Sequence, residues 1–355
     1  MTRIVKIGNI TIGGGNPVAV QSMCSTRTKD IVKTTAQIKR LQDAGCEIVR
    51  CGVPDMESAK AIAKIKKRIK IPLVADIHYD YRLALASIES GADKIRINPG
   101  NIGSTEKVEA VIAAARKAKC AIRIGVNSGS LKETSSFKLG EKSGNGRADR
   151  MVASLMEHVS FFESRGFKDV VISLKASDIL TTIAAYKLAA KYTDCPAHIG
   201  ITEAGTMLGG IIKSSVGLGI LLHEGIGDTM RVSLTEEPEK EVYAAYRILN
   251  ALDIRKRGVD IISCPTCART EIDVIKLAHR VEELTMKVTK PLKVAVMGCS
   301  VNGPGEASEA DIGVAGGRGI GLIFKKGVII KRVKKKDLMK EFEKELKKAS
   351  NAKGD

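Results

Sequence analysis

Eight short apolar runs, separated by stretches with helical periodicity, constrain this chain more than any other feature. The runs are Val18–Met23, Glu47–Cys51, Leu73–Ile77, Lys94–Asn98, Ala121–Val126, Val170–Lys175, His198–Thr202 and Met230–Leu234. Between them, apolar residues recur at helical spacing, as in 31–44 and 106–118. Eight strands that are each followed by a helix predict an α/β fold, a (β/α)8 TIM barrel. A doubly wound open sheet alternates similarly, but it often has a glycine-rich phosphate turn after its first strand, which is missing behind Val20–Met23.

The two ends of the chain depart from this rhythm. At the start, Ile4, Lys6, Ile10 and Ile12 alternate around a Gly8-Asn9 turn and predict a hairpin. A polar, glycine-containing segment at 130–147 predicts a long surface loop on the rim of the active site.

After Leu252 the βα rhythm stops, which predicts a barrel domain over 1–254 and a small α+β domain over 255–355. In the second domain we expect strands at Val259–Ser263, Lys293–Met297, Ile312–Val314 and Gly321–Phe324, and a helix within 271–285. A last helix buries Leu338, Phe342 and Leu346, which are four residues apart.

Composition narrows the class of protein. The 355 residues carry a net charge of +18, but aromatic residues make up 3% and Trp is absent, so stacking platforms for nucleic-acid bases are scarce. No targeting segment or membrane-spanning run is visible, so we expect a cytoplasmic enzyme that binds neither membrane nor nucleic acid. In that compartment the eight Cys are expected as free thiols, or as metal ligands where their spacing is tight.

Polar and charged residues stand at the carboxyl ends of the predicted strands, where barrel enzymes carry their active sites. They are Arg50, Asp76, His78, Arg96, Asn98, Arg123, Asn127, Lys175, Ser177, Thr202, Glu203, Arg231 and Ser233. Clustered cations need an anion, and guanidinium groups match phosphate oxygens, so these ends predict a phosphate or diphosphate substrate. Any single arginine could instead form a structural ion pair with Asp76 or Glu203.

Two of these residues are candidates for proton transfer. Glu203 is interpreted as a lone carboxylate among cations, which would lower its pKa and favour a role as a base or in charge stabilisation. His78 follows Asp76 by two residues at a strand end, and it could be either a catalyst or a satisfied polar residue.

Three cysteines in the second domain predict a metal centre. Cys264 and Cys267 form a C-x2-C pair before a helical stretch, and Cys299 follows a strand and opens a glycine-rich loop that contains Glu306. Structural zinc would require a fourth Cys or His, whereas an iron–sulfur cluster tolerates a non-Cys fourth ligand, for which Glu306 offers an oxygen. A redox dithiol at Cys264 and Cys267 is the alternative.

The sequence closely resembles the bacterial 4-hydroxy-3-methylbut-2-enyl diphosphate synthase (HMBPP synthase) family of the non-mevalonate isoprenoid pathway, in its two-domain form. The matching stretches, between Ala19 and Ala307, are AVQSM, EIVRCGVP, PLVADIHYDYR, IRINPGNIG, IRIGVNSGSL, LKASD, GITEAG, EGIGDTMRVSL, CPTC and NGPGEA. One departure is Cys24, where the family is expected to have Thr.

The resemblance implies an oxidoreductase that opens the ring of 2-C-methyl-D-erythritol 2,4-cyclodiphosphate and removes a hydroxyl as water. It implies two electrons from flavodoxin or ferredoxin, a [4Fe–4S] cluster on Cys264, Cys267, Cys299 and Glu306 with one open iron site, and a head-to-tail homodimer. Diphosphate would bind at Arg50, Arg96, Arg123, Lys175, Arg231 and Ser233. The remaining strand-end residues would line the pocket, with Asp76, His78, Glu203 and Glu306 in catalytic roles.

Two other functions are compatible with the composition. One is a zinc-stabilised barrel enzyme that acts on a sugar phosphate without redox chemistry. The other is a nucleic-acid binder, whose affinity would fall steeply with salt.

Overall fold

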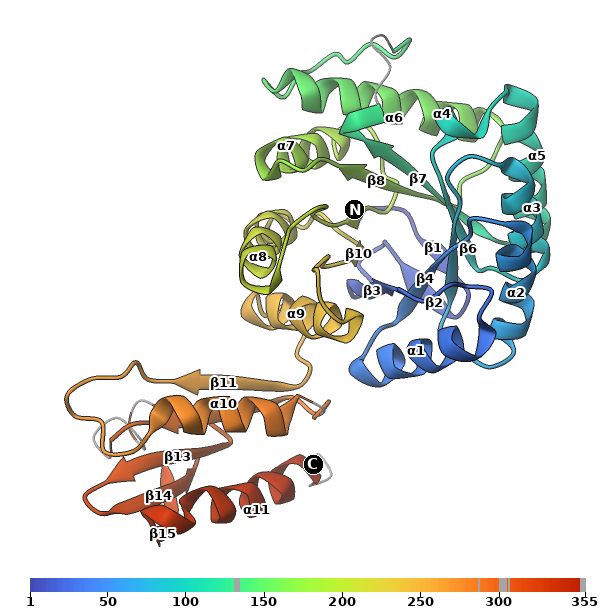
Figure 1. Cartoon of the computed structure of the whole chain (residues 1–355). Helices are drawn as coiled ribbons and strands as arrows, with labels where there is room; N and C mark the ends of the chain where they lie inside the picture. The colour runs from blue at the N-terminus through green and yellow to red at the C-terminus, as the bar shows by residue number, and fades with distance from the viewer. Residues whose placement is uncertain (131–134, 287, 300–304, 306, 352–355) are drawn as a thin grey trace. The chain divides into compact units, whose positions relative to one another are not determined.

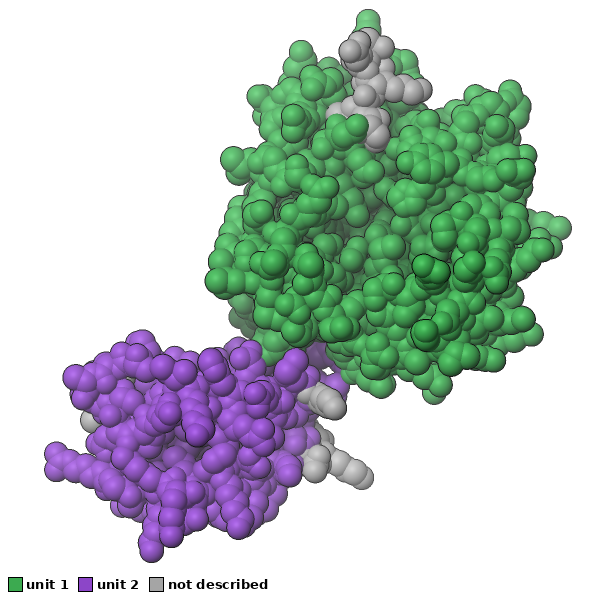
Figure 2. All heavy atoms as spheres, viewed as in Figure 1, with its two compact units in different colours: residues 1–255 green, residues 256–355 purple. Residues whose placement is uncertain are grey.

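The computed structural model describes residues 1–130, 135–286, 288–299, 305 and 307–351. Two compact units, Met1–Arg255 and Lys256–Asp355, divide the chain and are coloured separately in Figure 2. The division falls one residue beyond the position expected from the sequence. Each unit has a hydrophobic core of its own. Every helix among the described residues is too short or too polar to cross a lipid bilayer.

The first unit contains eight parallel strands arranged as a barrel, which confirms the predicted (β/α)8 fold (Figure 1). The strands are β3 Ala19–Met23, β4 Ile48–Gly52, β5 Leu73–Asp76, β6 Lys94–Ile97, β7 Ala121–Asn127, β8 Val170–Lys175, β9 His198–Ile199 and β10 Thr229–Met230. They are ordered β8-β7-β6-β5-β4-β3-β10-β9, and a parallel bridge between Ile172 and Ala197 completes the ring.

The last two barrel strands are shorter than the sequence predicts. β9 and β10 pair over two residues each, and residues further along the chain bond to side chains or loops. The Leu234 amide donates to Glu241 Oε1 at 3.0 Å, and Thr202 Oγ1 donates to the Ala176 carbonyl at 3.3 Å.

Helices surround the strands (Figure 1), and several of them begin at side-chain caps. They are α1 Ile31–Ala44, α2 Met56–Lys66, α3 Tyr81–Glu89, α4 Pro99–Ile102, α5 Thr105–Ala118, α6 Gly146–Ser164, α7 Ile179–Ala189, α8 Met207–His223 and α9 Pro238–Ala251, with a 3-10 turn η1 at Ser128–Ser130. Asp30, Asp55 and Asp178 each accept a hydrogen bond from the backbone N–H three residues later, which satisfies a free donor of the first turn.

A hairpin closes the amino-terminal end of the barrel. Its strands β1 Val5–Ile7 and β2 Ile10–Ile12 pack on the lowest inward-facing residues of the barrel, such as Ile48 and Val74. The predicted hairpin is confirmed; in its first strand Val5 and Ile7 are buried, whereas the preceding Ile4 is 63% exposed. Because side chains alternate along a strand, the intervening Lys6 is exposed.

The described part of the 130–147 segment lies along α7. Phe137 packs edge-on against Tyr192 with ring centroids 6.1 Å apart, and Lys191 pairs with Glu141 at 2.8 Å. α6 begins at Gly146 because Asn145 accepts hydrogen bonds from the backbone N–H groups of residues 147 and 148, so the predicted loop extended too far.

The second unit is a five-stranded sheet with two helices on one face. The elements are β11 Val259–Ser263, α10 Val274–Thr285, β12 Leu292–Met297, β13 Ile312–Gly317, β14 Ile320–Lys325, β15 Val328–Lys334, η2 Lys335–Asp337 and α11 Leu338–Asn351. The strands follow sequence order, with β11, β12 and β13 parallel and β14 and β15 antiparallel. Leu338, Phe342 and Leu346 are buried against the sheet, as predicted. The edge strand β15 was missed, because its charged and largely exposed residues lack an apolar alternation.

Candidate active site

The barrel interior is polar beyond the layer of apolar residues that packs on the amino-terminal hairpin. In β4, β6 and β7 the residues Val49, Ile95 and Ile122 belong to the core between strands and helices. The intervening residues therefore point inward. They include Arg50, Lys94, Arg96 and Arg123, all of which are buried.

A cavity of about 550 Å³ lies at the carboxyl ends of the strands. It is lined by Met23, Arg50, Asp76, His78, Arg96, Asn127, Ser128, Gly129, Lys175, Ser177, Thr202 and Glu203. Nine of these residues were predicted as site residues, so the fold brings them together from six different strand ends.

Asp76 lies between the cations. Its carboxylate is 3.8 Å from Arg50 Nε, 3.5 Å from an Nη atom of Arg96 and 3.4 Å from His78 Nε2. Burial alone would raise the pKa of Asp76, but His78 and the neighbouring guanidinium groups hold that pKa well below its ordinary value. Asp76 is therefore the ionised counter-charge within the arginine cluster.

Glu203 occupies a different position from the one predicted. Its side chain is exposed at the edge of the cavity, and its backbone adopts a left-handed φ of 55°. The interpretation of Glu203 as the lone carboxylate among cations was wrong, because inward alternation along β5 places Asp76 there.

Positive charge dominates this end of the barrel interior. Six cationic side chains lie near one another, namely Arg50, Lys94, Arg96, Arg123, Lys175 and Arg231, together with the carboxylates of Asp76 and Glu241. Burial, followed by repulsion from Arg50 and the other guanidinium groups, lowers the pKa of Lys175 well below its ordinary value. Burial likewise lowers the pKa of Arg50, to about 10. An anion in the cavity would relieve this repulsion.

Four predicted residues do not line the cavity. Arg123 is fully buried, close enough to Arg50 and Arg96 to be repelled by both. Arg231 pairs with Glu241 at 3.2 Å. Asn98 caps α4 by accepting from the Gly100 amide at 3.2 Å, and Ser233 is half-buried two residues beyond Arg231.

Several polar neighbours were missed by the sequence analysis. Lys94 is two residues before Arg96 on β6, so both side chains point into the barrel. This alternation would have been enough to predict Lys94 as an interior residue. Met23 Sδ accepts a hydrogen bond from Arg50 Nε at 3.0 Å, although a methionine at the end of an apolar strand would be expected to pack in the core. Glu241 also accepts from Ser22 Oγ at 3.2 Å, but it belongs to α9, far along the chain from the strand ends.

The three cysteines of the second unit lie at one end of its sheet. Cys264 directly follows β11, Cys267 is three residues further, and Cys299 follows the neighbouring strand β12 by two residues. The Gly298 amide donates to Cys264 Sγ at 3.1 Å. Backbone hydrogen bonding at Arg269 lowers the pKa of the exposed Cys267 thiol, which favours the thiolate that binds metal. Glu306, the predicted fourth ligand, lies outside the described residues.

The spacing of these sulfurs differs from that of ligands to a single ion. Within the described ranges, three or more Cys, His, Asp or Glu ligand atoms lie within 4.8 Å of one another only at Glu163, Asp194 and Cys195. In a cuboidal cluster each cysteine binds a different iron. The cysteine sulfurs are therefore further from one another than the four ligand atoms around a single zinc ion. The thiolate chemistry and the shared sheet end fit the sulfur ligands of an iron–sulfur cluster.

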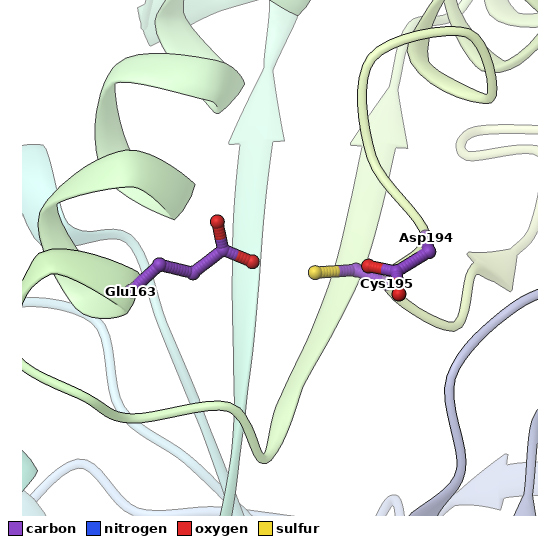
Figure 3. Close-up of side chains that lie close together, drawn as sticks. All are labelled: Glu163, Asp194 and Cys195. Atoms are coloured by element: carbon purple, nitrogen blue, oxygen red, sulfur yellow. The ribbon is translucent and has the colours of Figure 1, made fainter.

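The Glu163, Asp194 and Cys195 group is an ion-pair site. Figure 3 shows the Glu163 carboxylate facing Asp194 and Cys195 from a separate segment. The Arg3 guanidinium pairs with both carboxylates, and its Nε donates to Asp194 at 2.7 Å. This cation takes the place that a metal would need, so the group ties the amino-terminal segment to the barrel.

The chain matches known proteins over most of its length. Two family models match it, the GcpE TIM-barrel domain over residues 2–246 and the GcpE protein C-terminal domain over residues 260–348. A Maridesulfovibrio salexigens protein named 4-hydroxy-3-methylbut-2-en-1-yl diphosphate synthase (flavodoxin) is 56% identical over 346 residues, or 97% of this chain and 96% of that protein. A Caldanaerobacter subterraneus subsp. tengcongensis protein of the same name is 57% identical over 348 residues, or 98% of this chain and 97% of that protein. The solved structure of a 7,8-dihydropteroate synthase from Vibrio fischeri ES114 has a TM-score of 0.50 at 14% identity, covers 71% of this chain and 98% of its own, and shows a likeness of fold alone.

Proposed function

Because the chain belongs to the GcpE family, we propose that it makes 4-hydroxy-3-methylbut-2-enyl diphosphate from 2-C-methyl-D-erythritol 2,4-cyclodiphosphate. The reaction opens the ring at a carbon–oxygen bond and expels a hydroxyl as water. Two electrons and a proton enter for each turnover, and flavodoxin or ferredoxin supplies the electrons. The names of the relatives and the cationic cavity support this proposal.

The single observation that carries the substrate class is the excess of buried positive charge at the strand ends. Arg50, Arg96 and Lys175 line the cavity and would bind the diphosphate oxygens. Arg123 lies close to them and adds to the positive potential, while Arg231 and Ser233 follow strand β10. A bound diphosphate would favour the charged form of Lys175, which burial and the neighbouring guanidinium groups disfavour.

Polar residues around the cations would orient the carbon skeleton. Asn127, Ser177 and Thr202 line the cavity, and Asn98 directly follows β6. Asp76 holds Arg50 and Arg96 in place, and His78 hydrogen-bonds this carboxylate. Glu203, exposed at the edge, is the group we assign to proton donation or charge stabilisation near the departing hydroxyl.

The second unit would hold a [4Fe–4S] cluster through Cys264, Cys267 and Cys299, with Glu306 as the expected fourth ligand. When bound, the cluster supplies one-electron transfer and an iron site open to oxygen. The Gly298 amide, which donates to Cys264 Sγ, would stabilise negative charge on the sulfur. We further propose that the enzyme works in the cytoplasm as a head-to-tail homodimer, in which the second unit of one chain closes the barrel of its partner.

The test is anaerobic purification followed by turnover of the cyclodiphosphate with reduced flavodoxin or dithionite. We expect a brown protein with about four iron atoms per chain. Cys264→Ser, Cys267→Ser and Cys299→Ser should each lose iron and activity, whereas Cys120→Ser, at a buried thiol behind the barrel strands, should keep both. A colourless protein that holds one zinc and does not consume the cyclodiphosphate would overturn the proposal.

A further inference from the structure

A basic surface lies at one edge of the second unit. Residues 325–336 (KKGVIIKRVKKK) contain seven Lys or Arg and no Asp or Glu. Lys325 and Lys331 pair with Glu345 on α11. The other five cations are exposed and make no ion pair within the described part of the unit; they are Lys326, Arg332, Lys334, Lys335 and Lys336, here named the basic edge.

An apolar centre accompanies these charges. Val328, Ile329 and Ile330 are 66%, 37% and 39% exposed on β15, the outermost strand of the sheet. Among the strands that the structure describes, none pairs with the outer side of this edge. Aliphatic side chains flanked along the sequence by cations match the composition of a protein interface with an apolar centre and a charged rim.

Strand register relates this edge to the cysteines. Pairing places Val296 of β12, Val314 of β13, Ile323 of β14 and Lys331 of β15 in one row across the sheet, and Ser263 of β11 begins that row. The next row along the strands contains Arg332 of β15. Cys264, which directly follows Ser263, is in register with that next row. Since β11, β12 and β15 run in the same direction, the carboxyl end of β15 lies at the cysteine end of the sheet.

The distance along such a row is short on the scale of a protein interface. Four strand spacings of about 4.8 Å place β15 roughly 19 Å from β11. An interface of ordinary size covers about 800 Å² on each partner. A patch of that area is roughly 28 Å across, which is more than the distance from β15 to β11. A protein seated on the basic edge would therefore also reach the cysteine end of the sheet.

We propose that the basic edge is the docking surface for an acidic one-electron donor protein. The inference rests on the proposed function, which requires such a donor and places the electron acceptor at the three cysteines. Opposite charge would steer the donor to this edge and orient it, while Val328, Ile329 and Ile330 supply the apolar contact. Lysines on a sheet edge also prevent strand pairing between molecules, but that role does not require Lys335 and Lys336, which follow β15.

The test compares two triple variants that remove the same charge. Arg332→Gln, Lys334→Gln and Lys335→Gln together alter the basic edge. The control, Lys60→Gln, Lys64→Gln and Lys67→Gln, removes three exposed cations on and after α2 of the other unit. For each protein, the KM for reduced flavodoxin, the dissociation constant of oxidised flavodoxin, and dithionite-driven turnover are measured at low and high salt.

We expect the basic-edge variant to raise both the KM for flavodoxin and the dissociation constant about tenfold at low salt, with a weaker salt dependence. Its dithionite-driven turnover and iron content should equal those of the unaltered enzyme and the control. Unchanged flavodoxin affinity would overturn the docking proposal, as would salt-dependent binding of RNA at this edge with no effect on flavodoxin. Because binding of the oxidised donor needs no catalysis, failure of the proposed function would show separately, as loss of turnover in every protein.

Discussion

Asp76 and Glu203 show how position decides the role of a carboxylate. Both follow barrel strands and both line the cavity, but Asp76 is 4% exposed and touches Arg50, Arg96 and His78, whereas Glu203 is exposed at the edge. Removing the buried charge leaves its guanidinium partners uncompensated, which is costly. Removing the exposed charge changes little besides the chemistry of the site.

Asp76→Asn should therefore destabilise the protein by about 3 kcal/mol at neutral pH. Because the pKa of folded Asp76 lies below its ordinary value, the ionised carboxylate stabilises the fold above about pH 4, and this contribution is lost as the pH falls further. Urea unfolding should thus show a large difference in the free energy of unfolding between the unaltered protein and Asp76→Asn at pH 7, and a smaller difference at pH 3.5. Glu203→Gln is the matched control and should unfold like the unaltered protein at both pH values; equal loss in the two variants would contradict this account.

Lys94 is a fully buried cation inside the barrel. It is fully buried without a hydrogen-bond partner among the described residues, and burial, with repulsion from Arg123 and Arg50, lowers its pKa well below the ordinary value. A lysine in this environment costs stability at any pH where it must carry a proton.

Lys94→Met should stabilise the protein without ligand by about 1–3 kcal/mol, because it keeps the side-chain length and removes the buried amine. The folded protein with Lys94 binds fewer protons than the unfolded chain, so its stability rises with pH towards the ordinary lysine pKa near 10.4. The gain from Lys94→Met should accordingly be larger at pH 6 than at pH 9.5. Urea titrations check this, with the exposed Lys60→Met as a control that should change stability by less than about 0.5 kcal/mol.

At the scale of the element, glycines of β13 allow the cysteine-bearing strand to approach closely. A Cβ at Gly316 would lie 2.4 Å from the Gly298 carbonyl oxygen, which is a backbone atom that cannot turn away. Gly298 in turn donates to Cys264 Sγ and immediately precedes Cys299. The space at Gly316 therefore positions two of the three cysteines.

Gly316→Ala should reduce iron content and turnover several-fold, because Gly298 must move and carry its neighbours with it. The matched control is Gly219→Ala on α8, where a Cβ would meet no atom within 4 Å and should be neutral or stabilising by up to about 1 kcal/mol. Iron analysis and circular dichroism of both variants test this. Full iron content in folded Gly316→Ala would rule out the proposed positioning role.

At the scale of the whole molecule, two units with separate cores should respond to separate ligands. The anion site lies entirely within the first unit, and the cysteines lie entirely within the second. A ligand that binds only one folded unit stabilises that unit by mass action. Unfolding of such a chain is not expected to be two-state.

In calorimetry of the iron-free protein, inorganic diphosphate should raise the Tm of the barrel transition by several degrees and leave the second transition unchanged. Potassium chloride at the same ionic strength controls for screening. Arg50→Met should lose the shift, because Arg50 lines the cavity. An equal shift of both transitions would indicate general salt stabilisation in place of a specific site.

Much of this architecture could be predicted from the sequence, because the responsible interactions are local. The alternation of apolar runs with helical periodicity is a property of neighbouring residues, and it predicted the barrel and the helix 31–44 correctly. In a barrel, strand ends converge on one mouth, so Arg50, Arg96 and Lys175 could be assigned to one cavity from their strand positions alone. The family resemblance then supplied a substrate that no composition argument could name.

The tertiary structure decided what depends on packing between distant segments. It placed Asp76 in the position expected for Glu203, and it paired Arg231 with Glu241 of α9. It also selected which face of the first hairpin strand is buried, and it added β15 as a paired edge despite its charge. Sequence spacing fixes which residues share a strand or a helix face, whereas the environment of a charge depends on contacts between elements that are far apart along the chain.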